Sequence, residues 1–368
     1  MESRRFGWRL ISGPTPPRSS SWKEVRPASG TSSRNSRRVG DPRDRSHRRT
    51  SAERIRIAAI VGPTAAGKTD LSVEIAARLG AEIVSVDSAQ VYSGMDIGTA
   101  KPSPEQRAAV RHHLIDAYPP SHELAVAEFQ SLARSSIATI AERGRLPLLV
   151  GGSGLYWRAV VDDLEFPPHS PDVRARLEDE AQAVGKEKMH ARLAAVDPAA
   201  AASIDPTNVR RTIRALEVTE ITGHLFSDYA RAWTSYVGRY DLSVAGVTRA
   251  RAELWARIEA RVDLMMGAGL LSEARSLAPV LSSTARQTLG YRQILDAARG
   301  ASPEVIRDEI VRATKRFARR QLSWFRRDPR VVWFDASAPD TVDRLLNLLT
   351  SGGESRLGRL PKDRSRPQ

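Results

Sequence analysis

The sequence predicts an α/β fold, in which a parallel sheet is flanked by helices and one all-helical subdomain is inserted. Short apolar runs end in turns rich in glycine or aspartate at Arg54–Val61, Ala81–Val86 and Leu146–Val150, as buried parallel strands do. Residues 166–240 instead alternate amphipathic segments with turns and have no strand-like run, before Asp241–Val247 resumes a strand pattern. We therefore expect a core in two parts, 55–165 and 241–350, around a helical insertion.

Charge is unevenly distributed over the 368 residues, whose formal net charge is +14. Residues 1–54 hold 14 Lys and Arg against 5 Asp and Glu, and no apolar period, so we expect a disordered basic tail. An organellar transit peptide is the alternative interpretation of this Arg- and Ser-rich segment. Residues 351–368 are expected to form a second disordered tail.

The composition excludes several classes of site. The absence of cysteine excludes disulfides, cysteine-ligated zinc, iron–sulfur clusters and a thiol nucleophile. No run approaches the roughly 18 apolar residues of a membrane span, so we expect no membrane partner and a cytoplasmic protein. The excess of positive charge favours a polyanionic partner.

A phosphate-binding motif follows the first apolar run. Its residues are Gly62, Pro63, Thr64, Ala65, Ala66, Gly67, Lys68 and Thr69, which match G-x-x-x-x-G-K-[ST]. An amphipathic helix follows it and ends at Gly80. Backbone N–H groups would face an anion, Lys68 would add charge, and the Thr69 hydroxyl could ligate Mg²⁺. This context predicts a P-loop NTPase-like fold with a nucleotide or diphosphate site; a glycine turn without a ligand is the alternative.

Asp87 follows the second strand, and ligands of open α/β sheets bind at the carboxyl ends of strands. The third strand ends in Gly151–Gly154, where an ordinary P-loop NTPase would place its Mg²⁺-holding aspartate. A diphosphate cradle with a separate carboxylate favours diphosphate as a leaving group, with Asp87 accepting a proton from the nucleophile. A helix cap or an indirect anchor for Mg²⁺ is the alternative role of Asp87.

Eight segments together carry a family resemblance: Gly62–Thr69, Val86–Tyr92, Met95–Pro102, His112–Asp116, Val150–Tyr156, Arg211–Val218, Gln287–Arg292 and Arg319–Phe325. Over about residues 55–335 the chain resembles the tRNA dimethylallyltransferases, also called tRNA isopentenyltransferases. The resemblance implies transfer of the dimethylallyl group from dimethylallyl diphosphate to N6 of adenosine 37, beside the anticodon, in tRNAs that read codons starting with U. The expected partners of a monomeric enzyme are dimethylallyl diphosphate and the tRNA anticodon stem-loop, with Mg²⁺ as cofactor.

The resemblance also implies roles for single residues. Asp87 would be the base, Arg261 would lie against the diphosphate, and Thr64 would join the donors to it. The residues implied to contact tRNA are Asp87, Ser88, Ala89, Gln90, Ser153, Arg174, Arg210, Arg211, Thr212, Ile213, Arg214, Gln287, Thr288, Leu289, Gly290, Tyr291 and Arg292. The family often has Thr at the position of Ser153, and both side chains carry a hydroxyl.

Several basic and histidine residues have a second interpretation. Arg210, Arg211 and Arg214 fall within one helical turn, which suits phosphates lying between them, although a solvated face is the alternative. The same alternative holds for Arg261. The pair His112-His113 is expected to be structural rather than metal-binding.

The segment 312–330 carries eight Lys or Arg between aromatic residues. As a helix it would pack Phe317 and Phe325 inward while its basic face meets RNA, or it would be a core helix with a solvated side. We assign it no site.

Three rival functions share parts of these patterns: prenylation of free adenine nucleotides such as AMP or ATP, a small-molecule P-loop kinase, and an RNA-binding protein that uses the loop as a nucleotide switch. The nucleotide prenyltransferase would need neither the arginine-bearing insertion nor the basic C-terminal helix, whereas the lid arginines of a kinase could imitate the group of Arg210, Arg211 and Arg214.

Overall fold

This computed structural model describes residues 54–351, apart from residues 232, 234 and 299. Almost all of the two expected tails, residues 1–53 and 352–368, therefore lies outside the described residues. Within the described ranges, no helix is long and apolar enough to cross a membrane.

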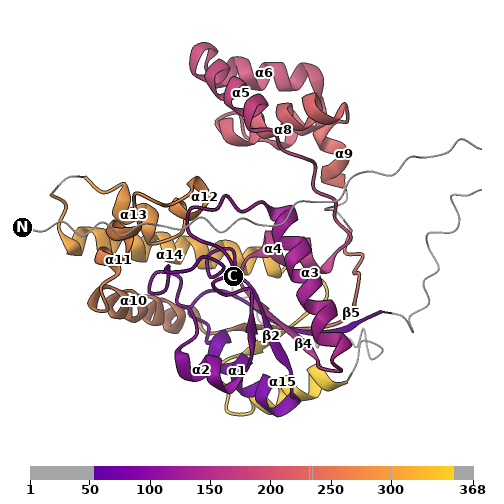
Figure 1. The fold of residues 1–368 in the computed structure, drawn as a ribbon, viewed down its shortest axis with the longest axis vertical. Coiled ribbons are helices and arrows are strands. Elements are labelled where there is room, and N and C mark those ends of the chain that lie inside the picture. Colours follow the sequence, from indigo (N-terminus) through magenta and orange to yellow (C-terminus); the bar gives the residue numbers. More distant parts are fainter. Residues whose placement is uncertain (1–53, 232, 234, 299, 352–368) are drawn as a thin grey trace, which may run out of the picture. The chain divides into compact units, whose positions relative to one another are not determined.

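A six-stranded sheet, parallel throughout, forms the centre of the fold (Figure 1). Its strands are β1 (Arg56–Val61), β2 (Glu82–Val86), β3 (His112–His113), β4 (Pro147–Gly151), β5 (Asp241–Thr248) and β6 (Val331–Asp335). They lie in the order β3-β2-β4-β1-β5-β6. All four strands expected from apolar runs are present, whereas β3 and β6 were not predicted.

The register aligns the ends of three central strands. Gly151 of β4 pairs with Val61 of β1 on one side and with Val86 of β2 on the other. The residues that follow these positions are the start of the phosphate loop, Gly152 and Asp87. Three segments that are remote in sequence therefore leave the sheet at the same level.

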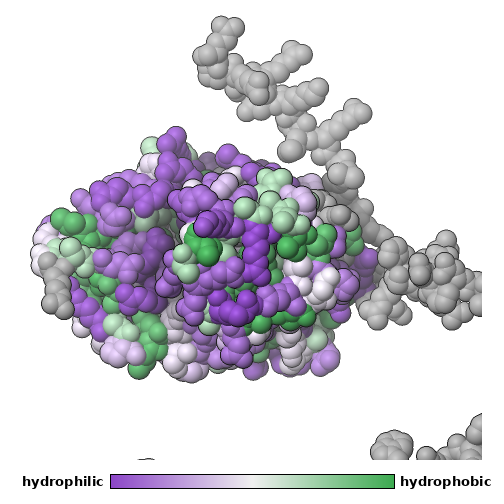
Figure 2. Space-filling model, turned by 90° about the horizontal axis from the view of Figure 1, so that it is seen from above, coloured by the Kyte–Doolittle hydropathy of each residue, from purple (hydrophilic) through white to green (hydrophobic). Residues whose placement is uncertain are grey.

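Helices cover both faces of the sheet, because alternate strand residues point to opposite sides. One face packs Ala58 and Ile60 of β1 against α1 (Lys68–Leu79), α10 (Arg251–Gly267) and α15 (Thr341–Thr350). The other packs Ile57 and Ala59 against α3 (Val126–Glu142), α4 (Gly154–Val161) and α14 (Pro303–Phe325). Shorter helices complete this part: α2 (Pro104–Ala109), α11 (Leu270–Leu277), α12 (Ser283–Arg286) and α13 (Tyr291–Leu295). The face of the molecule drawn in Figure 2 is mostly hydrophilic, with hydrophobic side chains in separate patches.

Between Pro171 and Arg231 the described chain forms only helices. They are α5 (Pro171–Val184), α6 (Lys186–Val196), α7 (Pro198–Ser203), α8 (Val209–Thr222) and α9 (Phe226–Arg231). They share a separate hydrophobic cluster that includes Leu177, Leu193 and Leu216, and they pack on one another in Figure 1. The short helix α7 begins here because Asp197 caps it by accepting the Ala200 N–H and Pro198 occupies its first position.

Candidate active site

The phosphate loop joins β1 to α1 in a strained, closely packed conformation. Gly62 lies so near β5 that an added Cβ would come within 2.2 Å of the Val247 carbonyl oxygen, so only glycine fits. Gly67 has a φ of +96° and precedes the first residue of α1. Two arginines then hold the loop from outside: Arg249 Nε donates to the Ala66 carbonyl (3.1 Å), and Arg257 Nε donates to the Ala65 carbonyl (3.0 Å).

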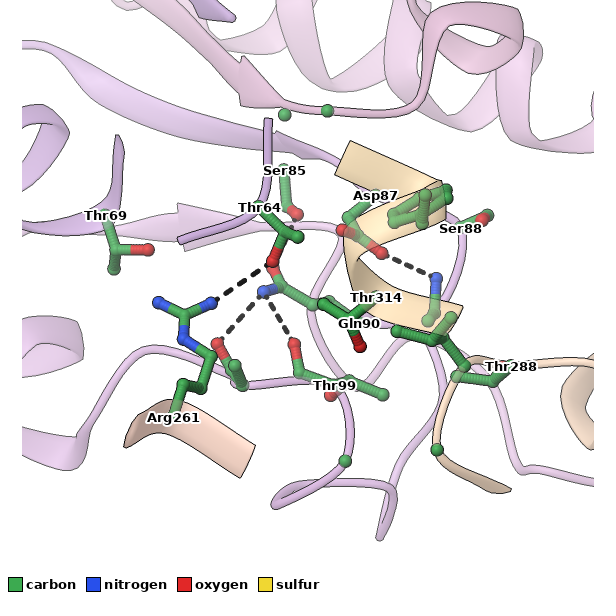
Figure 3. A pocket seen from close by; sticks show the side chains of 18 of the residues that line it. Thr64, Thr69, Ser85, Asp87, Ser88, Gln90, Thr99, Arg261, Thr288 and Thr314 are labelled. Atoms are coloured by element: carbon green, nitrogen blue, oxygen red, sulfur yellow. Dashed lines mark hydrogen bonds between the residues drawn. The ribbon is translucent and has the colours of Figure 1, made fainter. Parts of the chain in front are cut away.

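A cavity of about 430 Å³ opens beside this loop, at the aligned ends of β1, β2 and β4. Figure 3 labels ten of the side chains that line it, and they come from several segments between Thr64 and Thr314. Of the residues singled out in the sequence, those that line it are Thr64, Lys68, Thr69, Asp87, Ser88, Ala89, Gln90, Arg261, Gln287, Thr288, Leu289, Gly290 and Arg292. The other loop residues, Gly62, Pro63, Ala65, Ala66 and Gly67, lie behind this lining.

Lys68 is the cation at the floor of the cavity. Its Nζ donates to the Pro63 carbonyl at 2.7 Å. Burial lowers the pKa of Lys68, the nearby positive charge of Arg261 lowers it further, and Asp87 partly opposes both, so that the pKa falls to about 7. Asp87 therefore only partly balances the positive charges of Lys68 and Arg261, and an anion bound beside them would stabilise the charged form of Lys68.

Arg261 and Thr64 face each other across the mouth of the loop (Figure 3). Arg261 Nη1 lies 3.4 Å from Thr64 Oγ1, at the long end of a hydrogen bond. Burial, and then repulsion from Arg257, lowers the pKa of the Arg261 guanidinium. This arginine projects from the buried face of α10 and is not the solvated, acid-paired residue of the alternative interpretation.

Asp87, the residue after β2, is held by a hydrogen bond from a backbone group two residues along the chain. Its Oδ1 accepts the Ala89 N–H at 2.9 Å, a turn that aims the carboxylate into the cavity (Figure 3). Its charge acts on Lys68, which shows that the two groups share one electrostatic environment. The arrangement therefore offers a proton acceptor and an anion cradle to a single bound pair of substrates.

Gln321, which the sequence analysis missed, ties two of the strand ends together. Its Oε1 accepts the Thr64 N–H at 2.9 Å, and its Nε2 donates to the Gly152 carbonyl at the same distance. The residue after β4, Gly152, is closely packed, because an added Cβ would come within 2.3 Å of Gln321 Nε2 and within 2.9 Å of the Gly62 carbonyl oxygen. Gln321 lies in the segment Arg319–Phe325 that carries the resemblance, but that segment does not reveal its role, because both partners lie more than 160 residues earlier.

Two further side chains, Gln90 and Glu273, hold in place backbone segments that line the cavity. Gln90 accepts a bond from Ser85 and donates to the carbonyls of Thr99 and Ala100, which line the cavity. Glu273 accepts the backbone N–H groups of Asp96, Ile97 and Gly98. Both side chains shape the wall through backbone groups, and Glu273 was not expected from the sequence.

Some residues implied to contact tRNA lie away from the cavity. Tyr291 is fully buried, and its hydroxyl donates to Glu273. Ser153 precedes α4, and its side chain makes no capping bond there. Of the histidine pair, His112 hydrogen-bonds to the Val110 carbonyl and lines the cavity, whereas His113 hydrogen-bonds to Glu82.

The arginines of the insertion divide into two kinds. Arg174 of α5 and Arg214 of α8 both bond to the buried carboxylate of Glu217, at 2.5 and 2.9 Å. Glu217 therefore already offsets the charge of Arg214 within the fold, so the spacing of the arginines does not by itself require phosphates there. Arg210 and Arg211 point to solvent, whereas Thr212 and Ile213 are buried.

The basic C-terminal helix also differs from its expected packing. α14 ends at Phe325, which is fully buried as expected. Phe317 does not pack inward; it is only partly buried and lines the cavity. The reason is helical geometry, because Phe317 lies three residues beyond Thr314 and four before Gln321, both of which also line the cavity.

Comparisons with known proteins show the family to which the chain belongs. The family model described as IPP transferase matches residues 90–328. A tRNA dimethylallyltransferase of Streptomyces coelicolor is 52% identical over 292 residues, 78% of this chain and 93% of that protein. One of Thermobifida fusca is 51% identical over 302 residues, 80% of this chain and 94% of that protein.

Solved structures give the same result. The full-length tRNA isopentenylpyrophosphate transferase of Bacillus halodurans is 42% identical, with a TM-score of 0.59, covering 79% of this chain and 94% of its own. The structure of a eukaryotic dimethylallyltransferase acting on tRNA has a TM-score of 0.66 at 22% identity, covering 78% of this chain and 76% of its own. At this identity the match supports the fold alone. These matches confirm the resemblance and the P-loop-like fold: the chain belongs to the IPP transferase family, among the tRNA dimethylallyltransferases.

Proposed function

We propose that this protein transfers the dimethylallyl group from dimethylallyl diphosphate to N6 of adenosine 37, beside the anticodon, in tRNAs that read codons starting with U. One observation carries the proposal: Lys68 and Thr69 of the phosphate loop line the same cavity as Asp87. The names of the relatives support the reaction class. We propose further that the protein acts as a monomer in the cytoplasm.

The phosphate loop would hold the diphosphate. Loop amides, the N-terminus of α1 and Lys68 would oppose the negative charge that builds on this leaving group, usually the largest contribution in such sites. Arg261 and Thr64 flank the same space and would bind its oxygens. Lowering the barrier here matters most, because the allylic carbon itself tolerates positive charge.

Mg²⁺ fits this donor set. The Thr69 hydroxyl lines the cavity, and the described residues include no cluster of three or more His, Cys, Asp or Glu that could hold a metal. The phosphate oxygens and water would then supply the remaining ligands, as Mg²⁺ commonly requires. The ion would neutralise charge on the departing diphosphate.

Asp87 would act on the acceptor. The N6 lone pair forms a bond to the first carbon of the dimethylallyl group, while the carbon–oxygen bond breaks and its electron pair leaves with diphosphate. The N6 proton becomes acidic as the new bond forms, and the Asp87 carboxylate accepts it. A positioned base of this kind contributes about 10²–10⁴-fold to the rate.

The RNA would have to present an extruded base, because the target atom is inaccessible within a stacked loop. Exposed Arg210 and Arg211 would contact phosphates, and the segment Gln287–Arg292 would contact the loop where it lines the cavity. Arg174 and Arg214 would act in the same region while remaining paired to Glu217.

Mass analysis of nucleosides tests the proposal. The full chain is incubated with dimethylallyl diphosphate, Mg²⁺ and unmodified tRNA, and the digested RNA is compared with an AMP control. A prenyl mass increment on adenosine from tRNA, absent from AMP, is the expected result. Modification of AMP instead would indicate a nucleotide prenyltransferase, and ATP consumption with a small acceptor would indicate a kinase.

A further inference from the structure

Three side chains of α14 form one stripe that leads out of the cavity. Phe317, Arg320 and Trp324 are spaced three and four residues apart, so they lie on the same side of the helix. Phe317 and Arg320 line the cavity, and the Arg320 guanidinium lies 5.8 Å from the centre of the Phe317 ring. The Trp324 residue is 40% exposed.

Trp324 continues the stripe beside the end of β4. Its indole packs over Gly154, where an added Cβ would approach the ring to 2.2 Å, so glycine is required for the ring to lie next to Ser153. Trp324 meets Trp233 edge to face, with ring centres 6.4 Å apart, and Trp233 meets Phe166 at 6.1 Å. An aromatic row thus runs from the cavity to the two segments that border the helical insertion.

The chemistry of this row suits one class of occupant. Unpaired nucleic-acid bases stack on aromatic rings and on guanidinium planes, and neighbouring positive charge attracts their phosphates. Extruding one base from a loop also removes a stacking partner from the bases on either side of it. A row that begins at the reaction cavity is placed to replace those lost stacking contacts.

We propose that Phe317, Arg320 and Trp324, here called the stacking track, receive the unpaired nucleotides that flank the target adenosine. The inference rests on the proposed function, because it requires an RNA loop in the cavity. It assigns Trp324 a stacking contact and Arg320 a combined stacking and phosphate contact, neither of which follows from the phosphate loop or Asp87.

The helix contains a matched control for charge. Arg319 is adjacent to Arg320 in sequence, but it borders a separate shallow depression together with Trp255 and Arg316. Arg319→Gln and Arg320→Gln therefore remove the same charge from the same exposed helix, and only the second removes a group from the stacking track. Trp324→Phe keeps a ring where Trp324→Leu does not.

The test measures RNA affinity by fluorescence anisotropy, using anticodon stem-loop RNAs with intact or abasic nucleotides beside the target adenosine. We expect Trp324→Leu to weaken binding of intact RNA about 5- to 150-fold, the usual range for loss of one stacked base, with Trp324→Phe recovering most of it. The abasic RNA should bind wild type more weakly but should lose little further affinity with Trp324→Leu. Arg320→Gln should weaken binding several-fold more than Arg319→Gln.

Two outcomes would overturn the inference: equal binding of intact and abasic RNA by wild type, or the same loss for both RNAs in Trp324→Leu. The latter would mean that Trp324 only supports the fold. The wild-type and Arg320→Gln measurements remain decisive even if Trp324→Leu does not fold. Failure of the proposed function is distinct, because wild type would then leave intact RNA unmodified whether or not the stacking track binds it.

Discussion

The lowered pKa of Lys68 makes a quantitative prediction for diphosphate binding. Of the two forms of Lys68, only the charged ammonium attracts the diphosphate, and with a pKa of about 7 it is charged in about half of the molecules at pH 7. At pH 9 the charged fraction falls to about 1%, so the apparent Kd for dimethylallyl diphosphate should rise about 50-fold between these values. Binding at pH 8 should take up about 0.9 proton, because the bound anion restores the charge of Lys68.

Isothermal titration calorimetry measures both quantities, using buffers of different ionisation enthalpy, at constant Mg²⁺ and without RNA. Lys68→Arg is the matched control, because its guanidinium stays charged throughout this range. The control corrects for ionisation of the ligand itself, so the comparison concerns the slope with pH and not the absolute affinity. A wild-type slope equal to that of Lys68→Arg would refute the argument that burial and Arg261 discharge this lysine.

Two further predictions concern the groups that support the site. Gln321→Leu leaves the Thr64 N–H and the Gly152 carbonyl without their partner, so the free energy of unfolding measured by chemical denaturation should fall by about 1–3 kcal/mol. The control Gln182→Leu, at an exposed position, should change it little. Equal effects of the two substitutions would contradict the bridging role of Gln321. Burial raises the pKa of Glu217, but hydrogen bonds from its arginines and a backbone N–H outweigh it and bring the pKa to about 2, against 4.5 in the unfolded chain. Its carboxylate should therefore contribute roughly 3 kcal/mol to the free energy of unfolding above pH 4.5, and this contribution should be lost as the pH falls toward 2. The stability that Glu217→Gln loses relative to wild type in chemical denaturation should accordingly disappear in acid. A loss that does not depend on pH would contradict this ion pair.

The parts of the fold that the sequence predicted are those with a local signal. Apolar runs followed by Gly62, Asp87 or Gly151 identify strands and their ends without reference to any other part of the chain. The strand β3 gives no such signal, because it has only two residues. The strand β6 was missed although Val331–Phe334 is a short apolar run followed by Asp335, because its position on the sheet depends on pairing with β5.

The site shows the same division. The phosphate loop, Asp87 and Arg261 could be predicted because motif and family resemblance mark them. Gln321 and Glu273 could not, because their roles consist of bonds to backbone groups that only the folded chain brings near. The pairing of Arg214 with Glu217 was visible as a spacing of three residues on one helix, but the contribution of Arg174 requires α5 to pack on α8.

The proposed role of Asp87, accepting the proton in the cavity that would hold the diphosphate, is tested by single-turnover transfer to tRNA with Asp87→Asn. We predict a rate at least about 10²-fold lower, with the affinities for tRNA and dimethylallyl diphosphate changed only a few-fold. Asp70→Asn, which removes a carboxylate from the exposed start of α1, should leave the rate nearly unchanged. An undiminished rate in Asp87→Asn, or a loss explained entirely by weaker binding, would contradict this role.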